Sequence, residues 1–381
     1  MQKIIYIANH RLPTEKAYGI QISKMCEAFA ESGNEVILLA PYRISRIKDD
    51  FFDYYNVKKN FQFKKIFSLD FYLPGKLDQI AFPLKYLISA VILAIYALTR
   101  KADIIYSRDE LPLYLLSFFR KNLFLEIHKF SRKKMFLYKR FREQNFKVIA
   151  VSKGNKDELL KFGFKDENIT VAHDGVDLIV FDTDISKKEA RDKLVLPEGK
   201  ILVGYIGQLK TMGMEKGVDV LIESLKFLPG EVILTLVGGN ETDIGFYRKL
   251  SESKNLASRI LFIGRVKYSL VPLYLKAFDI LAMPFPNIRH YAFYMSPLKL
   301  FEYMASRRPI VTTDLPAIRE VLNESNSILV KPDDYESLAA GIRFILENEN
   351  HAQKLAERAF EDVKNYTWQK RAEKVLEFIK Q

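Results

Sequence analysis

The sequence has almost no cysteine and no long apolar run, and each scarcity excludes a class of protein. A single cysteine, Cys26, cannot form an internal disulfide, so a disulfide framework is excluded and a reducing cytosol fits. The longest uncharged run is the 14 residues from Tyr86 to Thr99. A membrane-spanning helix needs roughly 18 or more apolar residues. We therefore predict no transmembrane segment and interpret the run as a buried or half-buried helix, with a membrane-surface contact as the alternative.

Two sequence signals are also missing near the N-terminus. The turn after the first predicted strand, from Asn9 to Gly19, contains only Gly19, where a dinucleotide-binding oxidoreductase has Gly-x-Gly-x-x-Gly. The segment Met1 to Ala8 is too short and too lightly charged for a signal peptide, and its apolar part is typical of a first strand. These absences count against NAD binding and predict a cytoplasmic protein.

Basic residues exceed acidic ones and give a net charge of +12. They are densest from Lys129 to Arg142, where aromatic residues interleave with them and no acidic residue occurs. One interpretation is a solvated helix whose aromatic side chains face the core. The other is a basic amphipathic surface that rests on anionic lipid at the inner membrane face. Nucleic acid is not expected as a partner, because no recognition motif accompanies the charge.

Strand-like and helical patterns alternate along almost the whole chain, which has 381 residues and suits two domains. A helix is predicted over Ala17–Ser32 and Gly33 can end it. The first set of predicted strands is Lys3–Ala8, Val36–Ala40, Ile104–Tyr106, Leu123–Ile127 and Val148–Val151. The alternation predicts a parallel sheet with helices on both faces.

The same pattern restarts in the second half. The segment Asp182 to Lys200 is polar and is interpreted as a linker, and a helix after Gly207 carries Val218, Leu221 and Leu225 on one stripe. The second set of predicted strands is Ile201–Ile206, Val232–Val237, Ile260–Ile263, Ile280–Met283 and Ile310–Thr312. We predict an α/β protein of two doubly wound, Rossmann-like domains, 1–180 and 181–365, that face each other across a cleft. Ligands are expected at the carboxyl ends of the strands.

The segment from Ser296 to Ala305 predicts an anion site. Serine is a strong N-cap and proline is favoured at the first helical position, so a helix is expected to begin at Pro297. Its free N–H groups and Lys299 suit a diphosphate. The Glu302 carboxylate suits a ribose diol. An ordinary capped helix with an exposed glutamate is the alternative.

Two shorter segments are further candidates. A glycine after a strand, Gly207, allows close approach to a ligand, and Lys216 just before a helix can meet phosphate as a point charge. A common surface turn is the alternative. His128 follows the strand Leu123–Ile127 and can exchange a proton near neutral pH. A structural histidine is the alternative there.

These segments together resemble the family-4 retaining glycosyltransferases of the GT-B fold (glycosyl transferases group 1). Glu302 matches the second of two glutamates in the family's donor-binding segment, whereas Tyr294 stands where the first is expected. The segment Glu126-Ile127-His128 matches the family segment whose histidine approaches the donor sugar. Lys216 matches a lysine that grips the diphosphate, and Gln208 stands where arginine is often found.

The resemblance extends over nearly the full chain. It implies that Gly19 lets its loop approach the phosphate and acceptor, that the backbone near Val266 contacts the base, and that residues 366–381, beginning near Thr367-Trp368, form a last helix crossing back to the first domain. The positions implied for binding the donor are Gly19, Gly207, Gln208, Lys216, Val266, Ser296, Leu298, Lys299 and Glu302. His128, Lys216 and Glu302 are the implied catalytic residues.

The resemblance implies a retaining transfer from a nucleotide diphosphate sugar to a glycan, a lipid-linked molecule or another hydroxyl acceptor, in envelope polysaccharide or glycolipid synthesis. No metal or other cofactor is expected, because lysines and helix N–H groups can stabilise the departing diphosphate. Two alternatives stay open: a nucleotide-sugar 2-epimerase or phosphorylase on the same fold, and a degenerate, non-catalytic nucleotide-binding module.

Overall fold

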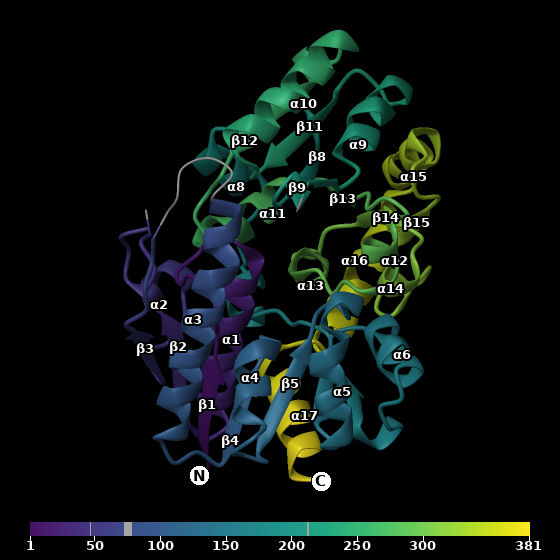
Figure 1. Cartoon of the computed structure of the whole chain (residues 1–381). Helices are drawn as coiled ribbons and strands as arrows, with labels where there is room; N and C mark the ends of the chain where they lie inside the picture. The colour runs from purple at the N-terminus through teal and green to yellow at the C-terminus, as the bar shows by residue number, and fades with distance from the viewer. Residues whose placement is uncertain (46, 72–77, 212) are drawn as a thin grey trace. The chain divides into compact units, whose positions relative to one another are not determined.

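The computed structural model describes residues 1–45, 47–71, 78–211 and 213–381, with residues 78–80 described by their backbone alone. The chain forms two compact α/β units (Figure 1). The first comprises Met1–Asp174 and Trp368–Gln381, and the second comprises Gly175–Thr367. The sequence patterns placed these divisions after residues 180 and 365.

The first unit is built on a parallel sheet with strand order β3-β2-β1-β4-β5-β6-β7. Its strands are β1 (Lys3–Ile7), β2 (Glu35–Pro41), β3 (Gln62–Ile66), β4 (Ile104–Ser107), β5 (Leu123–Ile127), β6 (Lys147–Ala150) and β7 (Ile169–Val171). The sequence missed β3 and β7, the two edge strands. Edge strands are short or partly polar, so they lack the apolar run that marks a central parallel strand.

Helices cover the sheet of the first unit. They are α1 (Ala17–Glu31), α2 (Phe51–Tyr55), α3 (Asp78–Leu98), α4 (Glu110–Leu116), α5 (Met135–Glu143), α6 (Lys153–Lys161) and α17 (Trp368–Lys380), with short 3₁₀ turns at Arg132–Lys134 and Asp166–Asn168. The predicted first helix is confirmed, and Gly33 follows it with a φ of 81°, a conformation that favours glycine. The last helix α17, yellow in Figure 1, packs against α1.

The second unit repeats the plan with strand order β12-β11-β8-β13-β14-β15, again parallel. Its strands are β8 (Ile201–Ile206), β11 (Val232–Val237), β12 (Ile260–Gly264), β13 (Ile280–Met283), β14 (Ile310–Thr313) and β15 (Ile328–Val330), and a small hairpin is formed by β9 (Lys210–Thr211) and β10 (Met214–Glu215). The central strand β11 is buried along its whole length, as expected for a parallel strand covered on both faces.

The helices of the second unit include one that the sequence analysis interpreted as linker. They are α7 (Leu178–Phe181), α8 (Lys187–Leu194), α9 (Val218–Ser224), α10 (Glu241–Ser253), α11 (Val271–Ala277), α12 (Arg289–Phe293), α13 (Leu298–Ala305), α14 (Pro316–Arg319), α15 (Tyr335–Glu347) and α16 (Glu349–Val363). Short 3₁₀ turns lie at Leu225–Phe227, Ala257–Arg259 and Tyr268–Leu270.

The linker interpretation of 182–200 was wrong because α8 lies inside it. A capping box between Ser186 and Glu189 starts the helix. Arg191 then anchors it to the second unit, since its Nη2 lies 2.6 Å from Asp279 Oδ2. The segment has few large apolar residues, and this ion pair adds to the packing of Ala190 and Leu194 against the core of the second unit.

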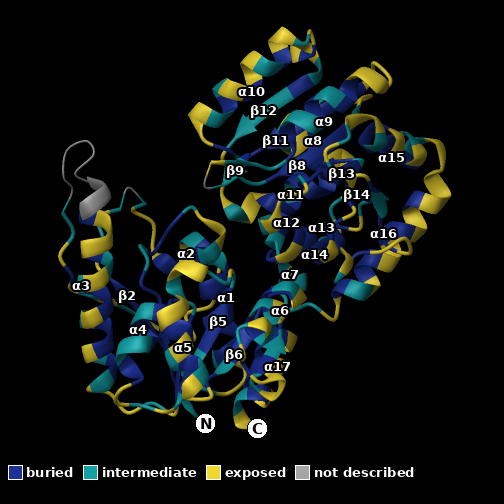
Figure 2. Cartoon of the chain, turned by 45° about the vertical axis from the view of Figure 1, so that its right-hand side comes forward, coloured by how far each residue is buried: buried dark blue, intermediate teal, exposed yellow. Residues whose placement is uncertain are grey.

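The apolar run near residue 90 belongs to a longer helix than its charge-free length indicated. α3 has 21 residues, and its window Ala81–Leu98 is long and apolar enough to cross a membrane by length and composition, although 39% of that window is buried inside the protein. The uncharged run counted in the sequence ends at Lys85, but in the structure Lys85 lies inside α3 and is buried. The half-buried helix is confirmed, with Leu93 and Ala97 against the core and exposed positions along its outer side (Figure 2).

Candidate active site

Each sheet has one place where the strand order reverses direction. In the first unit this is between β1 and β4, and in the second between β8 and β13. The connections leave the sheet in opposite directions at such a point, and doubly wound folds bind ligands there, beyond the carboxyl ends of the strands.

Lys299 lies against the turn that follows β8. A Cβ built on Gly207, whose φ is 131°, would lie 3.2 Å from Lys299 Nζ. The ammonium stands over the Tyr205 ring, 3.6 Å from its centre. Nζ is buried and has no hydrogen-bond partner among the described residues. Lys299 of α13 and Gly207, the residue after β8, are far apart in sequence and are brought together by the fold.

A second ammonium group lies close enough to act on the first. Burial lowers the pKa of Lys216 to about 8. Burial also lowers the pKa of Lys299 well below its usual value, and the charge of Lys216 lowers it further. The two buried ammonium groups repel each other, and the opposing effect of Glu302 does not restore the pKa of Lys299. A diphosphate would relieve this repulsion.

The turn that carries Lys216 is held by the glycine after it. Gly217 has a φ of 76°, and a Cβ there would lie 1.6 Å from the Pro284 carbonyl oxygen. Only glycine fits such a position. Since Pro284 follows β13, this contact joins the two loops on either side of the second unit's reversal point.

Glu302 is buried on α13, so the alternative of an exposed glutamate is wrong. Burial raises the pKa of its carboxyl to about 7, against opposing effects from Tyr268 and Lys299. The Tyr268 hydroxyl donates a hydrogen bond of 2.9 Å to Glu302 Oε1. Tyr268 was not predicted from the sequence, where its place two residues after Val266 was the available signal.

The start of α13 differs by one residue from the prediction. The helix begins at Leu298, and Pro297 is the residue before it, with φ −79° and ψ 126°. The N-cap is therefore Pro297, whose side chain cannot cap a helix. Ser296, the predicted N-cap, lies one position before it. The first N–H groups of the helix nevertheless belong to Leu298 and Lys299, whereas the Leu300 N–H donates to the Pro297 carbonyl oxygen at 2.9 Å.

Gln208 and Val266 have structural contacts of their own. The Gln208 carbonyl oxygen accepts a hydrogen bond of 2.9 Å from the Tyr205 hydroxyl, and its side chain is half-buried. Val266 is half-buried and packs against the core cluster of the second unit. Neither contact assigns a ligand, so their roles stay predictions.

In the first unit, His128 is paired with a carboxylate two residues before it. His128 Nε2 lies 2.5 Å from Glu126 Oε1. Burial lowers the pKa of His128 to about 4, with a further contribution from Arg108. The imidazole is therefore neutral at pH 7, with the Nε2 hydrogen donated to Glu126 and the Nδ1 lone pair left over.

Glu126 is the centre of a buried network that the sequence did not reveal. Gln21 Nε2 donates to its Oε1 at 2.6 Å, and the Tyr106 hydroxyl donates to its Oε2. Arg371 Nη2, from α17, lies 3.0 Å from Oε2. Burial alone would raise the pKa of Glu126, but Arg371, His128 and Arg108 together hold it below its usual range. The carboxylate is ionised and keeps His128 in place.

Gly19 has a packing reason for being glycine. It lies in the first turn of α1, and a Cβ there would be 2.1 Å from the Tyr55 hydroxyl and 2.9 Å from a Thr14 methyl group. Tyr55 holds the loop, since its hydroxyl accepts from the Thr14 N–H and donates to the Thr14 carbonyl. The predicted approach of Gly19 to a phosphate stays a prediction.

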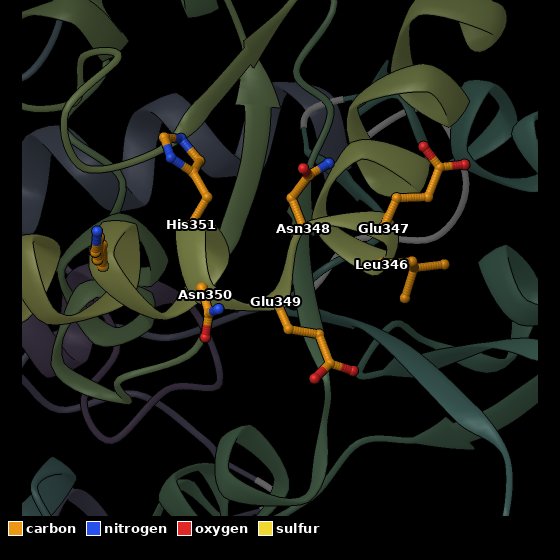
Figure 3. A pocket seen from close by; sticks show the side chains of 7 residues that line it. Leu346, Glu347, Asn348, Glu349, Asn350 and His351 are labelled. Atoms are coloured by element: carbon orange, nitrogen blue, oxygen red, sulfur yellow. The ribbon is translucent and has the colours of Figure 1, made fainter.

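A surface hollow lies away from these groups. It is lined by residues at the junction of α15 and α16 (Figure 3): Leu346, Glu347, Asn348, Glu349, Asn350, His351 and Lys354. The junction is not a strand end at either reversal point. We assign no ligand to it.

Two family models match the chain one after the other. Glycosyltransferase Family 4 matches residues 19–179, and Glycosyl transferases group 1 matches residues 186–362. A D-inositol 3-phosphate glycosyltransferase of Xylanimonas cellulosilytica is 25% identical over 61% of this chain and 56% of its own length. The lipopolysaccharide core biosynthesis mannosyltransferase LpsB of Rhizobium meliloti is 29% identical over 45% of this chain and 48% of its own.

The match to these curated relatives thus spans about half of their length. Among solved structures, Anabaena HepE in complex with UDP and glucose has a TM-score of 0.75 with 18% identity, and the comparison covers 100% of both chains. The two family models and the shared fold agree over both units. The chain belongs to the glycosyltransferases of family 4 and group 1, and its two α/β units have the GT-B fold.

Proposed function

We propose that this protein is a retaining glycosyltransferase that moves a sugar from a nucleotide diphosphate sugar to a hydroxyl of a glycan or lipid-linked acceptor. The observation that carries the proposal is the pair of lysines at the second unit's reversal point. Lys299 is buried without a hydrogen-bond partner among the described residues, and Lys216 lies close enough to depress its pKa. Such a pair is costly in the empty protein and favourable around a diphosphate.

The donor would bind to the second unit. Lys216, Lys299 and the first N–H groups of α13 would hold the diphosphate, and the Glu302 carboxylate would accept hydrogen bonds from the ribose hydroxyls. The base would lie along the segment containing Val266. Because ammonium and N–H groups supply the positive charge, we propose that the reaction needs no metal.

His128 would stand at the donor sugar, held by Glu126. In the reaction, the bond between the anomeric carbon and the diphosphate breaks with its electron pair on the phosphate oxygen. The acceptor oxygen bonds to the same face, and its proton passes to the departing phosphate. The enzyme contributes by orienting both substrates and stabilising the leaving group. LpsB, named for lipopolysaccharide core biosynthesis, supports an envelope glycan or glycolipid as the acceptor class.

The test is isothermal titration of the protein with UDP, GDP and ADP. We expect one nucleotide to bind, and Lys216→Ala and Glu302→Ala each to weaken binding by roughly 1–3 kcal/mol through lost charged hydrogen bonds. Lys226→Ala is the matched control, because Lys226 is exposed and pairs with Glu223 on the surface. Equal affinities in all variants would exclude the site.

Turnover then tests the reaction class. Incubation with sugar nucleotides and an acceptor panel should give a product whose anomeric configuration, measured by NMR, matches that of the donor. An inverted product would overturn the retaining mechanism. An epimerised sugar formed without acceptor would instead support an epimerase.

We also propose that the first unit binds the cytoplasmic face of an anionic membrane. The outer side of α3 exposes Leu84, Leu87, Val91 and Ile95, spaced so that they share one stripe. α3 packs against α4, and α4 against α5, which begins with the exposed Met135. A wide exposed apolar surface is uncommon on a soluble protein and marks a contact.

Exposed basic residues lie beside this apolar surface. Arg100 and Lys101 follow the end of α3, and Arg132 and Lys133 precede α5, and all four are exposed. Basic groups beside an apolar surface favour anionic head groups. This position would also bring a lipid-linked acceptor to the enzyme.

Vesicle sedimentation tests the membrane proposal. We expect more protein to sediment with vesicles containing phosphatidylglycerol than with phosphatidylcholine alone at low salt. The double change Leu84→Glu and Ile95→Glu should abolish the difference. Ile179→Glu in the second unit is the control, since Ile179 is 86% exposed. Equal recovery with both vesicles would contradict the proposal.

A further inference from the structure

A histidine that the sequence analysis did not name lies at the first unit's reversal point. β1 and β4 are neighbouring parallel strands on which the order of the sheet reverses (Figure 1). His10 is three residues beyond the end of β1, and Asp109 is two residues beyond the end of β4. The two side chains meet across the gap, with His10 Nε2 3.0 Å from Asp109 Oδ1.

The Asp109 side chain is buried and is fixed by hydrogen bonds. Its side chain is 5% exposed. The Asn9 N–H donates to its Oδ2 at 2.7 Å, and its own N–H donates to Ser107 Oγ at 2.9 Å. Burial alone would raise the pKa of Asp109, but His10, the Asn9 N–H and Arg108 hold it below its usual range.

The loop that carries His10 is tied down as well. Ser89 Oγ donates to Asn9 Oδ1 at 2.6 Å, and Asn9 Nδ2 donates to the Tyr86 carbonyl at 2.9 Å. On its other side, the His10 ring packs on Tyr18, with 4.6 Å between ring centres. The imidazole is therefore held by one nitrogen and one face.

The other edge of the ring is available to a ligand. In the tautomer that donates its Nε2 hydrogen to Asp109 Oδ1, the Nδ1 atom of His10 bears a lone pair. Nδ1 has no hydrogen-bond partner within the part of the chain that the structure describes, and the His10 side chain is 32% exposed. Nδ1 is thus a hydrogen-bond acceptor of fixed direction at a strand end, and the buried Asp109 carboxylate supports it. Such a group can bind a hydroxyl group.

We propose that His10, oriented by Asp109, binds the acceptor sugar by accepting a hydrogen bond from one of its hydroxyl groups at Nδ1. This inference rests on the proposed glycosyl transfer and names the acceptor residue of that reaction. Asp109 is a positioning residue: it sets the tautomer and the direction of the ring without touching the sugar. In the proposed function the nucleotide diphosphate is held by groups of the second unit and the donor sugar by His128, so the His10 contact is expected to affect the acceptor alone.

Kinetics of transfer give the first test. The probes are methyl glycosides as free sugars and octyl glycosides as sugars with an alkyl tail. We expect His10→Ala to raise the acceptor KM about tenfold, the size of one lost hydrogen bond. The nucleotide Kd and the slow hydrolysis of the donor by water should stay unchanged. Asp109→Asn should raise the acceptor KM as well. His351→Ala is the control, since His351 lies on the surface at the α15–α16 junction.

The two probe series separate the acceptor sources. An equal effect on methyl and octyl glycosides identifies the sugar itself as the ligand, and saturation only by octyl glycosides identifies a lipid-linked sugar. An unchanged acceptor KM, or a KM change accompanied by an equal change in nucleotide Kd, overturns the proposal. Absence of nucleotide binding by the unchanged protein counts against the proposed function and not against the His10 contact.

A second measurement does not depend on turnover. In protein labelled with ¹⁵N-histidine, the His10 ring signals are assigned by their loss in His10→Ala. We expect at least one methyl or octyl glycoside of the panel to shift the Nδ1 signal, and the same glycoside to leave His351 unshifted. If no glycoside shifts the His10 ring nitrogens, the proposal is overturned whether or not nucleotide binding has been found.

Discussion

Arg371, near the C-terminus, lies 3.0 Å from the buried carboxylate of Glu126 on the first unit's sheet. Its Nε donates to the His173 carbonyl at 2.8 Å, which fixes the guanidinium from a second direction. Since Glu126 also holds His128, the last helix of the chain supports a group at the candidate active site. This arrangement gives the C-terminal helix a role beyond packing.

Arg371→Met is expected to destabilise the protein strongly. It leaves Glu126 as a buried charge without its main counter-ion, which costs about 3–5 kcal/mol. Urea denaturation measures the loss, and Arg371→Lys should recover part of it because a charge returns. The double change with Glu126→Gln should cost less than Arg371→Met alone. A loss below about 1 kcal/mol would show that the pair is replaceable.

Lys299→Met is expected to raise stability and weaken nucleotide binding together. The buried ammonium has no hydrogen-bond partner among the described residues, so an apolar side chain of similar length removes a desolvation cost. The thermal midpoint should rise, while the Kd of the nucleotide rises about tenfold or more, as for a lost charged contact. Lys226→Met, on the surface, should change neither. A fall in both stability and affinity would indicate a structural lysine.

Binding of a sugar nucleotide should be strongest between about pH 7 and pH 8. Glu302 has a pKa raised to about 7, so below that pH its carboxyl is protonated and loses acceptor capacity. Lys216 has a pKa lowered to about 8, so above that pH its positive charge is lost. Titration calorimetry from pH 6 to pH 9 with a sugar ester of whichever of UDP, GDP and ADP binds checks this, because the esterified diphosphate lacks the terminal phosphate group that titrates near pH ~6.

Two variants assign the limbs of that profile. Glu302→Gln should flatten the acidic limb, and Lys216→Arg, whose guanidinium stays charged, should flatten the alkaline limb. A profile that is flat in the unchanged protein would contradict both assignments.

Comparison of Gly217→Ala with Gly213→Ala separates the cost of backbone strain from the cost of a collision between the new Cβ and a neighbouring atom. Both glycines have nearly the same φ, 76° and 75°, but a Cβ at Gly213 meets none of the described residues within 4 Å. Gly213→Ala should therefore cost about 1–2 kcal/mol of backbone strain. Gly217→Ala adds a collision with the Pro284 carbonyl and should cost about 3 kcal/mol or more, with weaker nucleotide binding through displacement of Lys216. Denaturation and titration of both variants check this; equal costs would contradict the collision.

Much of the fold could be predicted from the sequence because its signals are local. Central strands such as β8 and β11 are continuous apolar runs, and the prediction of Ile201–Ile206 and Val232–Val237 is confirmed residue by residue. α8 was missed for the opposite reason. Its segment has few large apolar residues, and the contacts that attach it, the Arg191–Asp279 ion pair and the burial of Ala190, join residues that are far apart in sequence.

The candidate site divides in the same way. Lys299 and Glu302 sit on one helix, so their spacing could be interpreted without a structure. Tyr268 was missed because its contact with Glu302 joins two elements, and a tyrosine in a loop carries no signal of its own. His10 was missed because its partner Asp109 follows a different strand.

The sequence by itself determined the two α/β repeats and the central parallel strands, because side-chain periodicity and turn residues act over a few positions. Only the tertiary structure decided which strand ends become neighbours. Strand order brings His10 to Asp109 and the turn of Gly207 to Lys299, and the return of the last helix brings Arg371 to Glu126. The physical reason is that these pairings are set by burial and packing over long sequence separations, and the chemistry of this protein depends on those contacts.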